Sequence, residues 1–455
     1  MRLHFIAIGG SAMHNLAIAL AKKGYQITGS DDAIFEPSLS RLKKYNLLPS
    51  HFGWFEGNIN PDLDAVILGM HARTDNPELL KAQELGIKIY SYPEYIFEQA
   101  KNKIRVVIGG SHGKTTITSM IMHVLNRCAK DFDYLVGAQL EGFETMVRLT
   151  DDAPYIIIEG DEYLASPIDK RPKFHLYKAN IGLISGVAWD HINVFPTLES
   201  YIDQFQIFIK TITDGGSLIY NSEDEVLEEI INFSETNIKL LPYTQPDAII
   251  KNGETSLLYQ GNEIPLKVFG KHNLQNIEAA RAVCNLLDIS DEAFYNAISS
   301  FKGAARRLEL LGENENTAVY KDFAHSPSKL KATIEAVKQQ YPERELVAVI
   351  ELHTFSSLNE KFLKEYEGTM DMADEAIVFI DKKTFEQKRM AEYHENVVKS
   401  AFGNKKLKFF NNPEIMEGFL SCINYKGKNL LLMSSGNFGS LNLSEIADKA
   451  LIKIN

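Results

Sequence analysis

The chain has 455 residues, of which 45% are hydrophobic and 24% charged, and its formal net charge is −12 at pH 7. This length exceeds what one hydrophobic core usually supports, so two or three domains are expected. The acidic balance argues against non-specific binding to nucleic acids or anionic membranes, and the absence of an 18-residue apolar run argues against membrane insertion. The cysteines, Cys128, Cys284 and Cys422, are widely separated and show no metal-ligand spacing, so we expect core thiols in a reducing cytoplasm.

The first hundred residues predict a module of alternating strands and helices. The apolar run that opens the chain is typical of a strand rather than a secretion signal, and a helix with one apolar stripe follows the Gly9-Gly10 turn. We expect strands in this block at residues 3–8, 25–28, 65–68 and 87–90. Such alternation is typical of α/β domains with mostly parallel sheets.

The Gly9-Gly10 turn could bind a diphosphate at the N-terminus of the following helix. Against the dinucleotide fingerprint G-x-G-x-x-G/A the chain has Ala7, Gly9 and Ala12, and Asp31 ends the second strand. Three alternatives are open: a nicotinamide cofactor, another diphosphate such as a UDP-sugar, or a structural turn without a ligand. A second nucleotide site downstream favours the UDP-sugar, because two phosphate-binding modules suit a ligase better than a dehydrogenase.

The most informative segment is a glycine-rich turn that follows an apolar strand over residues 104–108. A helix with one apolar stripe begins at Lys114, which can reach the outer phosphates of a nucleotide, while the Thr115 hydroxyl can bind Mg²⁺. Ile108 replaces the first glycine of the full phosphate-loop pattern, and the alternative is a turn that binds nothing. The predicted ATP contacts are Gly110, Ser111, His112, Gly113, Lys114, Thr115 and Thr116.

Acidic residues follow the next predicted strand, at residues 155–158. Glu159 could supply the oxygen ligand that a hard cation needs beside phosphates, or it could be a solvated acid in a polar loop with Asp161 and Glu162. His191, directly after Asp190, could lie beside the metal or could be an interior histidine. Further strands of this block are expected at residues 181–184 and 217–220.

The last third of the chain again alternates strands and helices, with strands expected at residues 317–320, 346–350, 376–380 and 430–433. The whole chain therefore predicts an α/β fold with three domains. These are a Rossmann-like UDP-binding domain over residues 1–100, a central phosphate-loop ATPase-type domain with a mostly parallel sheet over 101–302, and a Rossmann-like C-terminal domain over 303–455.

Taken together, these motifs resemble those of the Mur ligases, the ATP-dependent amide-forming enzymes of bacterial cell-wall synthesis. The resemblance covers essentially the whole chain, and the segments come in the family's order. They are residues 8–13 for the uridine-diphosphate loop, 110–116 for the ATP loop, 159–162 and 190–191 around the metal, 270–273 at the adenine, 306–307 at the triphosphate, and 322–325 at the ribose and active site.

The resemblance implies a role for each group of residues. Catalytic roles are implied for Lys114, Glu159, His191, Arg307 and His325, and Mg²⁺ ligands are implied at Thr115, Glu159 and His191. Further ATP contacts are implied at Asn273, Arg307 and Asp322, although Asn273 could also cap the following helix and Arg307 could be a surface charge. Contacts with the UDP-sugar are implied at Gly9, Gly10, Ser11, Ala12, Met13, Asp31 and His71.

Within the family, residues 161–163 and 169–174 look most like the branch that joins UDP-N-acetylmuramate to the peptide L-alanyl-γ-D-glutamyl-meso-diaminopimelate. The alternative is the branch that adds L-alanine to UDP-N-acetylmuramate. A peptide acceptor carries several carboxylates, which Lys170, Arg171 and His353 would contact, whereas the simpler reading of the charged run is a solvated loop. The chain departs from the family pattern at Lys321, Ser326, Thr354 and Ser357.

Two functions from other classes are also compatible with the sequence. One is a nicotinamide-dependent oxidoreductase with an added ATPase domain, and the other is a nucleotide-binding protein without catalysis. In every case we expect small-molecule partners, with ATP and Mg²⁺ as cofactors of the leading interpretation, and the sequence does not indicate an oligomeric state.

Overall fold

A computed structural model describes residues 1–189, 194–234, 236–251, 253–304, 307–388 and 390–452. The chain divides into two compact units. The first consists of Met1–Val187, Thr197–Thr244 and Ala279–Phe294, and the second of Ala188–Pro196, Gln245–Glu278 and Tyr295–Asn455. In the described ranges, no helix combines the length and the apolar character that crossing a membrane requires.

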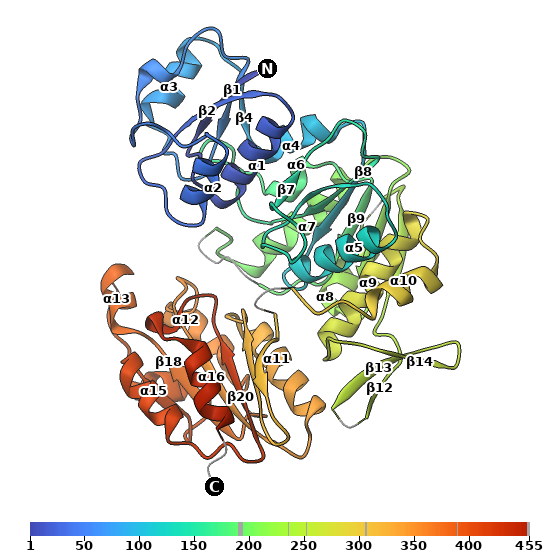
Figure 1. Cartoon of the computed structure of the whole chain (residues 1–455), viewed down its shortest axis with the longest axis vertical. Helices are drawn as coiled ribbons and strands as arrows, with labels where there is room; N and C mark the ends of the chain where they lie inside the picture. The colour runs from blue at the N-terminus through green and yellow to red at the C-terminus, as the bar shows by residue number, and fades with distance from the viewer. Residues whose placement is uncertain (190–193, 235, 252, 305–306, 389, 453–455) are drawn as a thin grey trace. The chain divides into compact units, whose positions relative to one another are not determined.

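The first unit opens with a four-stranded parallel sheet in the order β2-β1-β3-β4 (Figure 1). Its strands are β1 (Arg2–Ile6), β2 (Gln26–Ser30), β3 (Ala65–Leu68) and β4 (Ile89–Ser91). Its helices are α1 (Ser11–Lys22), α2 (Ser38–Lys44), α3 (Pro77–Glu84) and α4 (Tyr92–Ala100), with a short 3-10 helix at Glu56–Asn58. The strand order reverses between β1 and β3, and ligands of open α/β sheets bind in the crevice at such a point.

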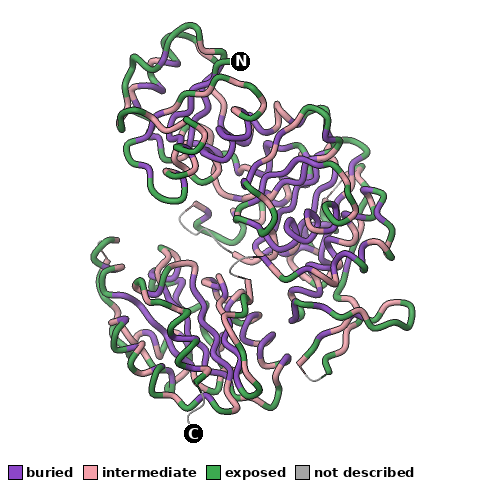
Figure 2. The backbone as a smooth tube through the Cα atoms, viewed as in Figure 1, coloured by how far each residue is buried: buried purple, intermediate pink, exposed green. Residues whose placement is uncertain are grey.

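The first unit also contains a seven-stranded sheet in the order β11-β10-β9-β5-β8-β6-β7, parallel except for β7. Its strands are β5 (Ile104–Gly109), β6 (Asp133–Leu135), β7 (Val147–Arg148), β8 (Tyr155–Glu159), β9 (Ile181–Ile184), β10 (Ser217–Asn221) and β11 (Lys239–Tyr243). Its helices are α5 (Lys114–Arg127), α6 (Lys173–Leu176), α7 (Leu198–Thr211) and α8 (Glu225–Asn232). The apolar residues of the central strands β5 and β8 are buried, as Figure 2 shows, apart from the first residue of each strand. The order reverses at β5, so the loop after β5 lies at the second crevice of this unit.

The second unit has a six-stranded sheet in the order β15-β16-β20-β17-β18-β19, parallel except for β15. Its strands are β15 (Glu309–Glu313), β16 (Ala318–Asp322), β17 (Glu345–Glu351), β18 (Glu375–Phe379), β19 (Lys408–Phe410) and β20 (Lys428–Met433). Its helices are α11 (Pro327–Gln340), α12 (Glu360–Leu363), α13 (Lys382–Lys388), α14 (Glu395–Ala401), α15 (Pro413–Ser421) and α16 (Leu443–Leu451), with 3-10 helices at Lys364–Tyr366 and Phe438–Ser440. Alternate residues of β17 belong to two separate hydrophobic clusters, so this sheet has a core on each face.

A small antiparallel sheet precedes this domain and consists of β12 (Ala248–Lys251), β13 (Glu254–Tyr259) and β14 (Asn262–Pro265). Two of the boundaries between the two units fall within helices, one in α9 (Lys271–Leu286) and one in α10 (Asp291–Ile298).

The predicted mixed α/β fold with mostly parallel sheets is confirmed. The strands expected at residues 65–68 and 181–184 have those bounds, whereas the opening strand ends at Ile6 because Ala7 adopts a left-handed conformation with φ of 67°. The expectation of core thiols is wrong for Cys422, which is exposed because it follows the surface end of α15. Cys284 is buried and Cys128 is half-buried, and none of the three forms a disulfide.

Candidate active site

The phosphate loop, residues 110–116, connects β5 to α5 and needs glycine at two positions. Gly110 and Gly113 have φ angles of 124° and 75°, in the region that side chains rarely adopt. A Cβ atom on Gly110 would lie 2.2 Å from the Ser185 hydroxyl oxygen. The loop therefore passes so close to β9 that only glycine fits at position 110.

Lys114, the first residue of α5, is held by acceptors on two sides. Its Nζ donates to the Gly110 carbonyl at 2.7 Å and to both carboxylate oxygens of Glu162 at 2.9 and 2.7 Å. The Tyr201 hydroxyl of α7 donates to Glu162 at 2.8 Å and lies 3.0 Å from the Ser111 hydroxyl. Burial lowers the pKa of Lys114, but the negative charge of Glu162 and its neighbours outweighs burial, and the pKa is raised. The loop therefore holds a fixed ammonium ion that is charged at neutral pH.

Glu159, at the end of β8, lies directly beside the phosphate loop. One carboxylate oxygen accepts from the Thr115 hydroxyl at 2.7 Å, and the other accepts from the Gly137 backbone N–H at 2.6 Å. A threonine hydroxyl and a carboxylate are oxygen donors of the kind that Mg²⁺ prefers, and phosphate oxygens usually complete such a site. The predicted ligand His191 lies outside the described residues, and within them no three His, Cys, Asp or Glu side chains could hold a metal ion.

One cavity of about 410 Å³ in the first unit brings several predicted residues together, and we call it the reaction cavity. Part of its wall consists of residues from the N-terminal turn and the start of α1, together with two residues that follow β3. These are Gly10, Ser11, Ala12, Met13, Met70 and His71. The rest belongs to the central domain and β4–α4, namely Tyr92, Lys114, Leu135, Val136, Gly137, Met146, Val147, Glu159, Asp161 and Lys173. The predicted UDP-sugar turn and the ATP-loop lysine therefore line the same space.

Two residues predicted to contact the UDP-sugar, Gly9 and Asp31, are bonded to each other at the base of the N-terminal turn. The Gly9 N–H donates to Asp31 Oδ2 at 2.7 Å, and the Asp32 N–H donates to Oδ1 at 3.0 Å. Asp31 is buried, and burial raises the pKa of its carboxyl group despite these hydrogen bonds. Asp31 therefore holds the backbone of the turn by these hydrogen bonds, and it is not among the described residues that line the reaction cavity.

Residues 161–174 form a hairpin-like loop, which we call the charged hairpin. Its arms exchange backbone hydrogen bonds from Phe174 N to Asp161 O, from Lys173 N to Tyr163 O, from Ala165 N to Arg171 O and from Ser166 N to Asp169 O, at 3.0–3.1 Å. Because of this backbone pairing, charged residues that are neighbours in the sequence face two different cavities. Lys173 lines the reaction cavity, whereas Lys170 and Arg171 line a different cavity of about 790 Å³, the outer cavity.

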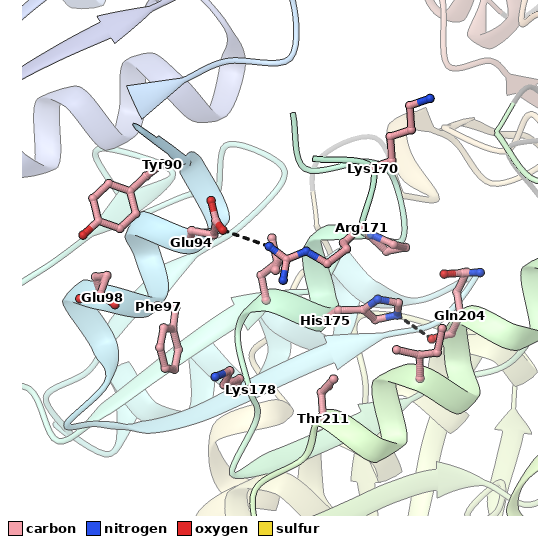
Figure 3. Close-up of a pocket in the computed structure, with 13 residues that line it drawn as sticks. Tyr90, Glu94, Phe97, Glu98, Lys170, Arg171, His175, Lys178, Gln204 and Thr211 are labelled. Carbon is pink, nitrogen blue, oxygen red and sulfur yellow. Dashed lines mark hydrogen bonds and ion pairs between the residues drawn. The ribbon is translucent and has the colours of Figure 1, made fainter. Parts of the chain in front are cut away.

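Figure 3 shows the outer cavity and the positions of its charged groups. The Arg171 guanidinium pairs with Asp169 at 2.7 Å and with Glu94 of α4 at 3.1 Å, whereas Lys170 extends away from this pair. Below them His175 Nε2 lies 2.7 Å from the Gln204 carbonyl, and burial lowers the pKa of His175 to about 4. Of the two cations predicted to contact a peptide, Arg171 is already bound to carboxylates of the protein.

Three predicted site residues of the second unit, Arg307, Asp322 and His325, lie near the end of β16. Asp322, at the end of β16, accepts from the backbone N–H groups of Leu308 and Ala324, each at 2.7 Å. Arg307 lies over the Phe323 ring, with its Cζ 4.6 Å from the centroid. His325 Nδ1 lies 2.9 Å from the Phe323 carbonyl. These residues surround the end of one strand, where α/β folds commonly place ligand contacts.

The interpretation of Asn273 as a helix cap is wrong, because α9 begins two residues earlier, at Lys271. Asn273 lies inside the first turn and its side-chain amide donates to the Phe269 carbonyl at 2.9 Å. His353 follows β17, and its Nε2 lies 3.3 Å from the Ser435 hydroxyl.

At the four positions that depart from the family pattern, two side chains have local structural roles. The Thr354 hydroxyl donates to the Ser357 hydroxyl at 2.9 Å and closes a turn. Ser326 precedes α11 without a capping hydrogen bond from its side chain, and Lys321 is half-buried in β16.

Several residues at the site have no individual role in the predictions made from the sequence: Tyr92, Gly137, Asp161, Glu162, Lys173 and Tyr201. In the sequence, Asp161 and Glu162 belong to an acidic cluster, and Lys173 belongs to a charged run. Their separate functions depend on the pairing of the charged hairpin. No sequence pattern indicates that Tyr201 belongs to the site, because an aromatic residue on the apolar face of a helix usually indicates only core packing.

Three family matches together cover most of the chain. Residues 2–104 match the Mur ligase family catalytic domain, residues 108–284 the Mur ligase middle domain, and residues 306–436 the Mur ligase glutamate ligase domain.

Among relatives in sequence, a UDP-N-acetylmuramate–L-alanine ligase from Sulfurihydrogenibium sp. (strain YO3AOP1) is 30% identical over 97% of this chain and 96% of that protein. An enzyme of the same name from Clostridium kluyveri is 32% identical over 83% of this chain and 82% of that protein. Among solved structures, a murein peptide ligase from Psychrobacter arcticus 273-4 matches with a TM-score of 0.66 at 21% identity over 100% of both chains. A UDP-N-acetylmuramate–alanine ligase from Thermotoga maritima matches with a TM-score of 0.67 at 21% identity over 96% of both chains. The chain therefore belongs to the Mur ligase family of ATP-dependent, amide-forming ligases, and it has the family's N-terminal, middle and C-terminal domains.

Proposed function

We propose that this ligase joins the carboxylate of UDP-N-acetylmuramate to an amine by way of an acyl phosphate. The observation that carries this proposal is the composition of the reaction cavity. Residues 10–13 of the predicted UDP-sugar turn line the same space as Lys114 and Glu159. A helix N-terminus at each turn offers a favourable place for phosphate groups.

In the proposed first step, a carboxylate oxygen of the sugar nucleotide attacks the γ-phosphorus of ATP, and the bond to ADP breaks. In the second step, the amine attacks the acyl carbon, and inorganic phosphate leaves as the amine loses a proton. Phosphoryl transfer of this kind depends mainly on positioning and on neutralising negative charge. Lys114, fixed between Gly110 and Glu162, is placed to provide part of that charge. Mg²⁺ bound to Thr115 and Glu159 would add further positive charge at the phosphates.

The names of the sequence relatives favour L-alanine as the amine. Both relatives described above are L-alanine ligases, and one of them aligns over nearly its whole length. The relatives therefore support the L-alanine alternative better than the peptide acceptor that residues 161–163 and 169–174 favour. We therefore propose L-alanine as the first acceptor to test.

The charged hairpin favours a second candidate, the peptide L-alanyl-γ-D-glutamyl-meso-diaminopimelate. Its exposed Lys170 and the paired Arg171 lie beside the outer cavity, which has room for a sizeable polar ligand. Cations at such a position can bind carboxylates by charge-assisted hydrogen bonds. Arg171 would have to exchange its bonds to Asp169 and Glu94 for bonds to the peptide, so Lys170 is the better candidate.

A panel of acceptors tests both candidates with the same protein. The assay contains Mg·ATP and UDP-N-acetylmuramate, and it measures released phosphate and the amide product with either L-alanine or the peptide. UDP-N-acetylglucosamine, which has no lactyl carboxylate, serves as the control donor. Amide formation with one acceptor identifies the substrate. Phosphate release that does not depend on the muramyl donor would contradict the proposed function.

The remaining site residues are part of the same proposal. We propose ATP contacts by Asn273, Arg307 and Asp322, a catalytic role for His325, an acceptor contact by His353, and metal binding by His191. The domain bounds proposed from the sequence are residues 1–100, 101–302 and 303–455. Three free cysteines agree with the reducing cytoplasm in which we propose that the enzyme works.

A further inference from the structure

The reaction cavity contains a second lysine, Lys173, in addition to Lys114. Its side chain is 13% exposed, and its Nζ donates to Asp161 Oδ2 at 2.6 Å. Burial lowers the pKa of Lys173, but the nearby negative charge of Asp161 outweighs burial, and the pKa is raised. The cavity therefore contains two ammonium groups, each held by its own carboxylate, Lys114 by Glu162 and Lys173 by Asp161.

The position of Lys173 is fixed by its surroundings. Its backbone N–H donates to the Tyr163 carbonyl at 3.0 Å, which anchors it in the charged hairpin. Its Nζ lies 5.7 Å from the centroid of the Tyr92 ring and 5.6 Å from that of the Tyr163 ring. Among the residues that the structure describes, Asp161 is the hydrogen-bond acceptor of Nζ, and an ammonium group has two further hydrogens to donate.

Two anions have to approach each other in the proposed reaction, the γ-phosphate of ATP and the carboxylate that attacks it. Lys114 belongs to the phosphate loop and serves the phosphates. The carboxylate needs a separate positive group, because two negative charges a few ångströms apart repel each other strongly in a partly buried site. Among the described residues that line the reaction cavity, Lys114 and Lys173 are the two lysines, and no arginine is present.

We propose that Lys173 binds the carboxylate of the sugar nucleotide and holds it for attack on the γ-phosphate. This inference rests on the proposed function and adds a specific residue to it. Lys173 keeps its protons throughout the step. The carboxylate oxygen forms the new bond to phosphorus, and the bond to ADP breaks. Lys173 would also account for preference for a donor that carries a carboxylate over one that lacks it.

Calorimetry with two donors tests this inference directly. The affinity of UDP-N-acetylmuramate is compared with that of UDP-N-acetylglucosamine, which lacks the carboxylate, for the wild type and Lys173→Met. We expect Lys173→Met to weaken binding of the muramyl donor by about 10- to 100-fold, the usual effect of a charge-assisted hydrogen bond. Binding of UDP-N-acetylglucosamine should change less than about twofold.

Three further variants separate recognition of the carboxylate from a structural effect. Lys173→Arg keeps the positive charge and should recover part of the lost affinity. Lys210→Met removes an exposed lysine of α7 and should leave both affinities unchanged. Asp161→Asn/Lys173→Met removes the negative charge of Asp161 together with its lysine partner, and it should lose the preference for the muramyl donor even if Lys173→Met folds poorly.

The outcomes distinguish this inference from the proposed function. If the wild type forms the amide but Lys173→Met keeps the wild-type ratio of the two affinities, Lys173 does not bind the carboxylate and the proposed function stands. An equal loss of affinity for both donors would mean that Lys173 only supports the fold of the cavity. A wild type that binds no UDP-N-acetylmuramate would overturn both.

Discussion

The two glycine turns of the first unit have the same strand–turn–helix design but use it differently. The N-terminal turn is supported from below by Asp31, which accepts the Gly9 N–H, so the carboxylate there serves the backbone. At the phosphate loop, Glu162 and Glu159 instead accept hydrogen bonds from the side chains of Lys114 and Thr115. The first turn is therefore a backbone surface of fixed conformation, whereas the second turn carries a positive charge at a fixed position. The comparison indicates that binding and chemistry are divided between the two turns.

The largest expected effect comes from removing the charge at the second turn. Lys114→Met should lower the rate of amide formation by about 10³-fold, because removing one preorganised group that stabilises the transferring phosphoryl group costs this much. Phosphate release in the presence of both substrates measures it. A variant with wild-type stability and more than a tenth of the wild-type rate would show that the second turn does not supply the essential charge.

A pair of glycine variants compares how tightly the two turns are constrained. Gly110→Ala should lower the free energy of unfolding by about 2–4 kcal/mol, because alanine is strained at a φ of 124° and its Cβ would lie 2.2 Å from Ser185 Oγ. Gly10→Ala should cost about 1 kcal/mol or less, because its Cβ would meet Met13 Cγ at an ordinary 3.4 Å.

Urea denaturation measures both free energies. Equal losses from Gly10→Ala and Gly110→Ala would contradict the difference between the turns. Gly142→Ala is a useful reference, because φ at this position is 84° but a Cβ would meet nothing within 4 Å.

Tyr201→Phe tests whether the second turn depends on its network of side chains. Loss of the hydroxyl removes hydrogen bonds to Glu162 and Ser111, and we expect the kcat to fall by about 10-fold with a smaller change in the KM for ATP. Tyr155→Phe, at the opposite end of β8 from Glu159, is the matched control and should keep wild-type kinetics. A Tyr201→Phe enzyme with unchanged kcat would show that Glu162 positions Lys114 without help.

The smallest expected effect concerns the ion cluster at Glu144, beside the helices of the first turn. Hydrogen bonds from Lys22, Tyr45 and Lys44 lower the pKa of Glu144 to about 2. Because the pKa of Glu144 is lower in the folded protein than its ordinary value of 4.5, the ionised carboxylate stabilises the fold at pH values above 4.5. This stabilisation is lost as the pH falls towards 2.

Because Glu144 is exposed, Glu144→Gln should lower stability at pH 7 by less than about 1 kcal/mol, and less still in high salt. Thermal unfolding between pH 2 and pH 7 measures the effect. A loss that is larger at pH 2 than at pH 7 would contradict this assignment.

Much of the fold could be predicted from the sequence, because its main strands are apolar runs between glycine-containing turns. The small sheet β12–β14 was not predicted, since Ile250 and Leu258 are exposed and its strands have no continuous apolar run.

The phosphate loop could be predicted because its residues are consecutive in the chain. The separate environments of Lys173 and Arg171 could not, because they follow from backbone pairing within the charged hairpin. The contribution of Tyr201 depends on the packing of α7 against the phosphate loop, which no local pattern encodes.

The central claim is that the carboxylate of UDP-N-acetylmuramate is phosphorylated in the reaction cavity before the amide forms. Labelling that carboxylate with ¹⁸O and analysing the released phosphate by mass spectrometry tests this claim most directly. We predict one ¹⁸O atom in each phosphate that is released together with an amide from fully labelled donor. Unlabelled phosphate, released in step with amide formation, would contradict the acyl-phosphate mechanism.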